Sequence, residues 1–143
     1  MTRRLLLPVL IMTLLASAAE AGSVTVSGSW FRALPGKLPA AGYFTLHNSG
    51  RTAVVLTSAQ SPGCGMLMLH MTHNMNGMMQ MMEVPKVDVP AGGTVTFATG
   101  GYHLMCTNPT PALRLGANMP VTLRFADGSQ ITTVFPVRSA TGQ

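Results

Sequence analysis

Short alternating apolar runs, separated by turn-forming residues, dominate the sequence after residue 21 and limit the folds open to it. The runs occupy residues 24–27, 43–47, 53–57, 66–70, 94–98, 102–106, 121–126 and 130–137. None has a helical period, and Gly, Pro, Asn or Asp lies between them. The Asp127-Gly128 pair between the last two runs is a hairpin signal. The pattern predicts an all-β fold, a Greek-key β-sandwich in a single domain.

The first 21 residues have the features of an export signal. Arg3 and Arg4 precede the apolar run 5–15, and a small-X-small sequence ends at Ala21. We expect cleavage after Ala21, with an uncleaved anchor as the alternative. The apolar run is shorter than the ~20 residues that span a membrane. The mature domain, residues 22–143, is therefore expected to be a periplasmic protein outside the membrane.

The charges of the chain are few and scattered. Nine Lys and Arg stand against four Asp and Glu, for a formal net charge of +5, without a basic run. This distribution argues against nucleic-acid binding. The acidic residues of the mature domain, Glu83, Asp88 and Asp127, lie in separate segments, and the sequence has neither a Gly-rich phosphate loop nor a Ser nucleophile elbow. We therefore do not expect an enzyme.

Histidine, cysteine and methionine gather between Cys64 and Cys106. This stretch holds three of the four His, both Cys and nine of the twelve Met, eight of them within residues 66–82. Methionine ordinarily fills gaps in a core. Here it is interspersed with Asn, Gly, Gln and His, a composition unlike that of a buried segment. The stretch therefore contains the candidate binding residues.

Four residues in this stretch have side chains that bind soft metal ions: His70, Met81, His103 and Met105. Residues i and i+2 of a strand share a side, so His103 and Met105 are expected to point the same way. The same period places Leu67 and Leu69 in the core and His70 outside. Taken singly, each residue is more often a surface histidine or a packing methionine. Together, two thioethers and two imidazoles favour Cu(I) over Zn(II), Mg(II) or Ca(II).

The spacing of these four residues resembles that of a known family, the periplasmic copper chaperones called PCuAC. Their pattern is His, ten residues, Met, twenty-one residues, then His-X-Met, and this sequence matches it without a gap. Similarity extends over nearly all of the mature chain, including residues 41–46, 61–62, 90–93, 100–105 and 135–137. The resemblance implies a cupredoxin-like β-sandwich that carries Cu(I) and hands it on.

The resemblance also implies the partners. Proteins of this family exchange copper with other periplasmic proteins, and a Sco-type protein or subunit II of cytochrome c oxidase is the expected type, for assembly of the CuA centre. We expect the domain to act as a monomer, without nucleic acid and without a membrane segment after signal cleavage.

Residues 71–80 are expected to form a polar, mobile loop that contains Gly and returns the chain to Met81, as a hairpin would. Further soft ligands lie in and beside it: Met71, His73, Met75, Met78, Met79 and Met82. They are candidates for a second, looser copper site or a relay. They are equally candidates for adaptable contacts to a partner, since methionine-rich surfaces accept varied partners. The remaining histidine, His47, is interpreted as an ordinary surface residue.

Cys64 and Cys106 are an even pair in an exported chain, which favours a disulfide. Such a bridge would close a loop of about forty residues. Strict alternation puts Cys64 on the face of His70 and Cys106 on the core face, so a bulge or turn at residues 62–65 is needed. If both are reduced, Cys106 is a buried thiol, or either cysteine competes for copper.

Two other functions fit parts of this pattern. A blue-copper electron carrier uses a similar sandwich, but its metal site needs a Cys thiolate with two His and a weak axial Met. No His follows Cys106 in this sequence. A metal-free β-sandwich binding module is the second alternative. Its melting temperature would not respond to Cu(I), whereas a tightly bound ion raises the melting temperature of the protein that holds it.

Overall fold

The computed structural model describes residues 22–143 and is built from strands. The export signal predicted for residues 1–21, with its cleavage site, lies outside the described residues. Within residues 22–143, no helix is long and apolar enough to cross a membrane. The ten strands are β1 (Val24–Arg32), β2 (Ala40–Asn48), β3 (Val54–Gln60), β4 (Cys64–Met75), β5 (Met78–Glu83), β6 (Val87–Val89), β7 (Thr94–Phe97), β8 (Tyr102–Pro109), β9 (Asn118–Phe125) and β10 (Gln130–Arg138).

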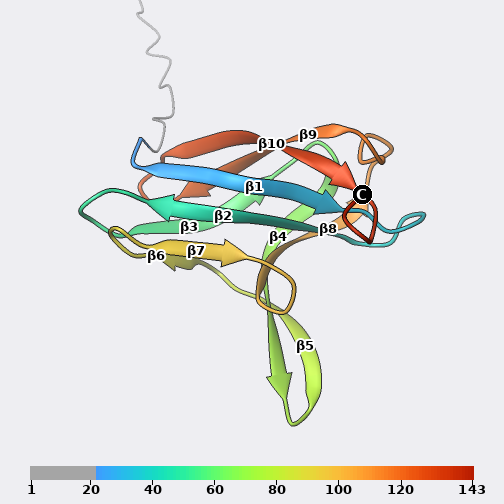
Figure 1. Cartoon of the computed structure of the whole chain (residues 1–143), viewed down its shortest axis with the longest axis horizontal. Coiled ribbons are helices and arrows are strands. Elements are labelled where there is room, and N and C mark those ends of the chain that lie inside the picture. Colours follow the sequence, from blue (N-terminus) through green and yellow to red (C-terminus); the bar gives the residue numbers. More distant parts are fainter. Residues whose placement is uncertain (1–21) are drawn as a thin grey trace, which may run out of the picture.

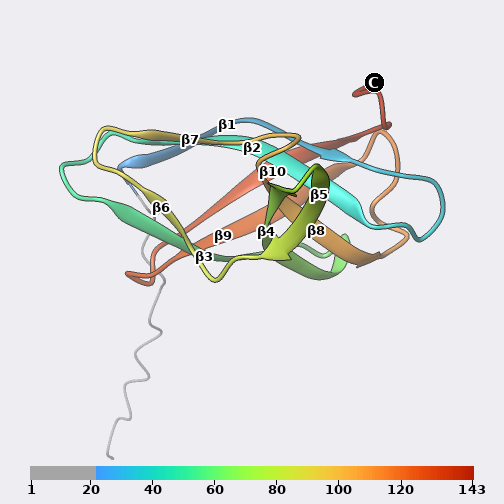
Figure 2. The ribbon, with the colours of Figure 1, turned by 90° about the horizontal axis from the view of Figure 1, so that it is seen from below.

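The strands form the predicted cupredoxin-like sandwich. Hydrogen bonds link them in the order β5-β4-β8-β2-β1-β10-β9-β3-β6, and β7 pairs with β2. Neighbours in this order are often distant in sequence, as in a Greek key. Figures 1 and 2 show two layers, with β1, β2 and β7 in one and β3, β6 and β9 in the other. A short parallel contact between β1 and β10, at Phe31 opposite Val137 and the pair after it, joins the layers.

The core lies between the layers and is centred on aromatic side chains. Phe31, Phe44, Phe97 and Phe135 are almost completely buried, and the rings of Phe44 and Phe97 stack with centroids 4.3 Å apart. Each such side chain contributes about 1.5–3 kcal/mol by leaving water. The predicted alternation along residues 121–125 is confirmed, because every second residue of this segment is buried. This packing provides a rigid body on which β4 and β8 are fixed.

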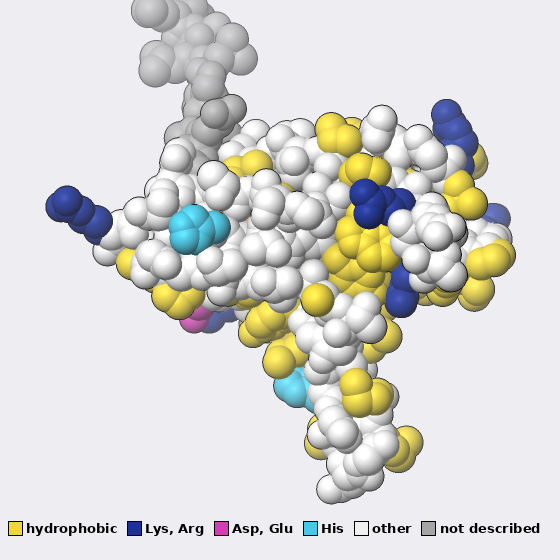
Figure 3. All heavy atoms as spheres, in the orientation of Figure 1, with side chains coloured by type: hydrophobic (Ala, Val, Ile, Leu, Met, Phe, Trp, Pro, Cys, Tyr) yellow, Lys and Arg dark blue, Asp and Glu magenta, His cyan; other side chains and the backbone are white. Residues whose placement is uncertain are grey.

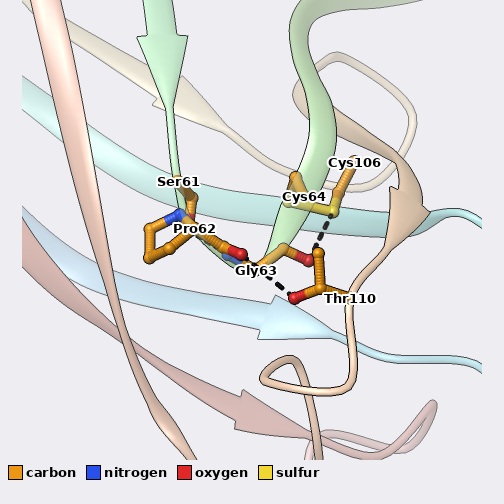
Figure 4. The surroundings of a disulfide bond; sticks show 6 residues. All are labelled: Ser61, Pro62, Gly63, Cys64, Cys106 and Thr110. Carbon is orange, nitrogen blue, oxygen red and sulfur yellow. Dashed lines mark hydrogen bonds between the residues drawn. A yellow bond between two sulfur atoms is a disulfide. The ribbon is translucent and has the colours of Figure 1, made fainter.

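A disulfide joins Cys64, at the start of β4, to Cys106 in β8, with their Cα atoms 5.4 Å apart. In the ladder between these strands, Cys64 is opposite Pro109 and Cys106 is opposite Leu67. Because the two bridged cysteines are not directly opposed, β4 bends towards the core at its start. The bend is tight at Gly65, where a Cβ atom would lie 2.8 Å from the Cβ of Asn108. The turn at residues 61–64 is held by the Thr110 hydroxyl, which donates a hydrogen bond of 3.0 Å to the carbonyl oxygen of Pro62 (Figure 4).

The predicted return of the chain at residues 71–80, as in a hairpin, is confirmed, but the loop predicted there is wrong, because most of these residues lie in paired strands. β4 continues to Met75 and β5 returns from Met78. Asn76 and Gly77 form the turn with φ values of 54° and 83°, the left-handed pair that a two-residue type I′ turn requires. The ladder between β4 and β8 ends at Met71, so the rest of the hairpin projects from the body (Figure 1).

Candidate metal centre

The four predicted ligands lie on three neighbouring strands. His70 on β4 pairs directly with His103 on β8, and Met105 follows two residues later on the same side of β8. Met81 on β5 pairs with Thr72, which is two residues beyond His70 on β4. Directly paired residues share a face of the sheet. The register therefore brings all four side chains to one face, at the base of the projecting hairpin.

The two imidazoles each present a nitrogen without a hydrogen-bond partner. Their ring centroids are 5.6 Å apart and the planes are inclined by 64°. His103 donates from Nδ1 to the carbonyl oxygen of Gly101 at 3.3 Å, so the lone pair of the neutral ring is on Nε2. His103 Nε2 and His70 Nδ1 are both buried and unpaired. Unpaired buried polar atoms cost about 1–3 kcal/mol each unless a ligand meets them.

Met81, His103 and Met105 line one cleft of about 240 Å³. His103 is 4% exposed, whereas Met81 is 59% exposed. His70 adjoins this cleft through the ring of His103. The ligand types are therefore graded from a buried imidazole at the bottom to a solvent-exposed thioether at the rim.

The pKa of His103 is held below its ordinary value, first of all by burial. The positive charges of His70, when protonated, and of Arg32 act in the same direction, and the hydrogen bond to Gly101 opposes them. His103 is therefore a neutral imidazole at neutral pH, which is the form that binds a metal.

Arg32 is a cleft residue that the sequence did not indicate. It lines the same cleft as His103, its Nε is buried and unpaired, and its guanidinium carbon lies 5.6 Å from the ring centre of Tyr43. A fixed positive charge here repels a bound cation. Sequence spacing does not predict that Arg32 lies near His103, because β1 and β8 are separated by β2 in the sheet.

The donor set suits a soft ion of low charge. Within residues 22–143, His, Cys, Asp and Glu side chains form no group of three or more placed to hold a metal ion. The two imidazoles are accompanied instead by thioether sulfur, which binds Cu(I) in preference to hard cations. Both cysteines of the chain are in the disulfide, so no thiolate competes.

The other soft ligands are divided between the two faces of the hairpin. The β4–β5 register puts Met71, His73, Met75, Met78 and Met82 on one face. Met79 lies on the opposite face, with Met81, so the group expected from the sequence does not form one cluster. His47 is exposed on β2, where its Nδ1 hydrogen-bonds the hydroxyl of Thr94 at 2.8 Å. That contact agrees with its interpretation as a surface residue.

The chain is similar in sequence to a family of proteins described as putative lipoproteins. The family described as "Putative lipoprotein LpqE-like" matches residues 24–137. A protein of Leifsonia xyli subsp. xyli, described as "Putative lipoprotein Lxx21020", is 34% identical over 124 residues, which cover 86% of this chain and 74% of the relative.

Two solved structures have the same fold. The solution structure of CuI-DR1885 from Deinococcus radiodurans is 32% identical to this chain, with a TM-score of 0.66, and the match covers 83% of each chain. The copper-bound PCuAC domain from PmoF2 is 22% identical with a TM-score of 0.69, over 82% of this chain and 94% of that domain.

Proposed function

Because the chain belongs to the LpqE-like family, which is the PCuAC family that its sequence resembles, we propose that it is a Cu(I) chaperone of the cell envelope. Its ligands are His70, Met81, His103 and Met105. The PCuAC family consists of copper-binding chaperone domains and not of enzymes. The cuprous ion is in this view the cargo of the protein.

One observation carries the proposal. Two buried imidazole nitrogens without partners, His70 Nδ1 and His103 Nε2, lie on directly paired residues beside a cleft that Met81 and Met105 line. A bound ion would satisfy both nitrogens, and the two sulfur atoms would select Cu(I). The copper(I) form named for the related DR1885 structure supports this choice of metal.

The exposure of Met81 suits transfer. In our proposal Met81 is the first ligand to leave, because it is on the projecting hairpin and 59% of its surface is exposed. A donor atom of the partner takes its place while the imidazoles still hold the ion. The bond from copper to Met81 breaks as the new bond forms, and copper stays Cu(I) throughout. The positive charge of Arg32 beside the site favours release.

We further propose that the signal sequence directs the protein to the periplasm and is cleaved after Ala21. The description of the family as lipoproteins supports an exported protein associated with the envelope. Its partners are copper-accepting or copper-donating periplasmic proteins, with a Sco-type protein or oxidase subunit II, and thus the CuA centre, as the specific proposal from the resemblance.

An anaerobic Cu(I) titration against a chromophoric chelator tests the ligand set. We expect one tight equivalent in the wild type, weakened at least about tenfold, or ~1.4 kcal/mol, by Met81→Leu and by His103→Ala. Met66→Leu is the matched control, because Met66 is also an exposed methionine of the sheet but pairs with Thr107, beyond the ligands.

Equal affinities for the wild type and both ligand variants would contradict the proposal. Thermal melts of each variant without copper show whether it is folded. An unchanged melting temperature on adding Cu(I) to the wild type would favour the metal-free module. An intense blue colour with Cu(II) would favour the electron carrier, although that site needs a thiolate and both cysteines are bridged.

A further inference from the structure

The register of the β4–β5 hairpin sorts its side chains into two sets. The ladder is regular from the body to the tip, and its pairs are Met71 with Met82, Thr72 with Met81, His73 with Gln80, Asn74 with Met79 and Met75 with Met78. The Asn76-Gly77 turn fixes this register, since a two-residue type I′ turn allows one pairing of its flanking strands. A slip by one residue would exchange the two faces.

One of these faces carries a histidine and four methionines. Directly paired residues share a face, as do residues two apart on a strand. His73 is at the centre of its face, with Gln80 opposite it. The methionines of this face surround that pair, and they are Met71, Met75, Met78 and Met82. The opposite face carries Thr72, Asn74, Met79 and Met81, and leads to the site already described.

The four sulfur atoms are within reach of the His73 ring. Met78 and Met82 are diagonal neighbours of His73, at about 7–8 Å. Met71 and Met75 are two residues from His73 along β4, at about 6.6 Å for a rise of about 3.3 Å per residue. An unbranched thioether side chain is long and flexible enough to bridge such distances. His73 and Met71 are half-buried and the other three methionines are exposed, so an ion from solvent reaches them. Residues 71–82 include no charged side chain that would repel it.

We propose that this face is a second Cu(I) site, held by His73 and by thioethers of the four methionines around it. The second site lies on the face of the hairpin opposite the first site, and the two sites share no ligand. The second site has one imidazole in place of two and is more exposed. Its affinity is therefore lower, by at least about tenfold, or ~1.4 kcal/mol.

The second site has its own titration test. In the anaerobic Cu(I) titration, the wild type should bind two equivalents in separate steps. His73→Ala and Met75→Leu should each abolish the second step or weaken it at least about fivefold, or ~1 kcal/mol, and leave the first step unchanged. Met81→Leu should do the reverse, so failure of one site is distinguishable from failure of the other.

Met79→Leu is the matched control for a specific site. Met79 is nearly as exposed as Met78, 62% against 67%, and lies one residue away on the other face. Its replacement should leave the second step unchanged. A wild type that binds a single equivalent would overturn the proposal. So would a second step weakened as much by Met79→Leu as by Met75→Leu, because any exposed methionine would then serve.

A spectroscopic readout separates ligand loss from loss of the hairpin. With methyl-labelled methionine, the second equivalent should shift the NMR signals of Met75 and Met78 and leave that of Met79 in place. The same spectra, recorded without copper, show whether His73→Ala keeps the hairpin. Equal shifts for all exposed methionines would overturn the proposal.

Discussion

The two parts of β4 have different surroundings. In the first part, residues 64–71, the strand pairs with β8, its start is bridged to Cys106, and Leu67 and Leu69 are buried. In the second part, residues 72–75, β4 pairs with β5 alone, and its last two residues are exposed. One part belongs to the rigid body and the other to the projecting hairpin.

Because of this difference, the body would hold the copper ion and the hairpin would allow its exchange. His70 lies near the end of the first part of β4 and pairs with His103 on β8. Packing and the disulfide between these two strands therefore fix both imidazoles. Met81 belongs to the hairpin, which projects from the body (Figure 3) and in which all six residues of β5 are exposed. Such segments open at a lower free energy than the core does. Copper exchange would then need motion of the hairpin only.

Removal of the disulfide should cause the largest loss of unfolding free energy, and it should destabilise the body and not the hairpin. The cysteines are 42 residues apart in sequence, and opening a loop of that length costs about 4 kcal/mol of unfolding free energy. Urea denaturation of the Cys64→Ala/Cys106→Ala variant measures this loss. Hydrogen exchange at the hairpin should be unchanged. A loss below about 1 kcal/mol would mean that packing alone holds the start of β4.

Replacement of the glycine in the hairpin turn should have a smaller and local effect. Gly77 has a φ of 83°, and a side chain there costs about 1–2 kcal/mol. Gly77→Val should speed amide exchange in residues 72–82 and weaken Cu(I) binding through Met81, without changing the global unfolding midpoint. Gly128→Val is the control, since Gly128 has a φ of 86° in the β9–β10 turn of the body. That variant should show the reverse pattern.

The smallest expected effect is on the pH dependence of the copper-free protein. The folded pKa of His103 lies below its unfolded value, so His103 contributes no penalty above pH ~6.5 and reduces stability as pH falls through that value. His103→Gln should flatten this decline, whereas replacement of the exposed His47 should not.

An NMR titration of His103 in the Arg32→Gln variant should show the pKa of His103 raised, because a positive charge is removed.

The sequence predicted the body better than it predicted the hairpin. Residues 121–126 and 130–137 alternate between apolar and polar side chains because one side of each strand packs on the core, and this signal located β9 and β10. The spacing from His70 to Met105 identified a set of residues that the structure brings to one cleft and its border. The first inference rests on a buried face, and the second rests on ligand type and on a spacing shared with a known family.

The hairpin lacks that signal, which explains the missed strand β5. All six residues of β5 are exposed, so no core imposes an alternation on them. The Asn76-Gly77 dipeptide was the available clue, because it favours a two-residue turn more strongly than a mobile loop. The cleft position of Arg32 had no local signal, since it depends on the order of β1, β2 and β8 in the sheet.

The accessibility of Met81 also makes the site sensitive to oxidants. Oxidation of a thioether to a sulfoxide replaces a soft sulfur donor with a polar group that a reductase must restore. Met81, with 59% of its surface in solvent, would be oxidised before Met119, which is 4% exposed. Damage would therefore begin at the rim and leave two imidazoles with the single thioether of Met105, a donor set less selective for Cu(I) over other transition metals.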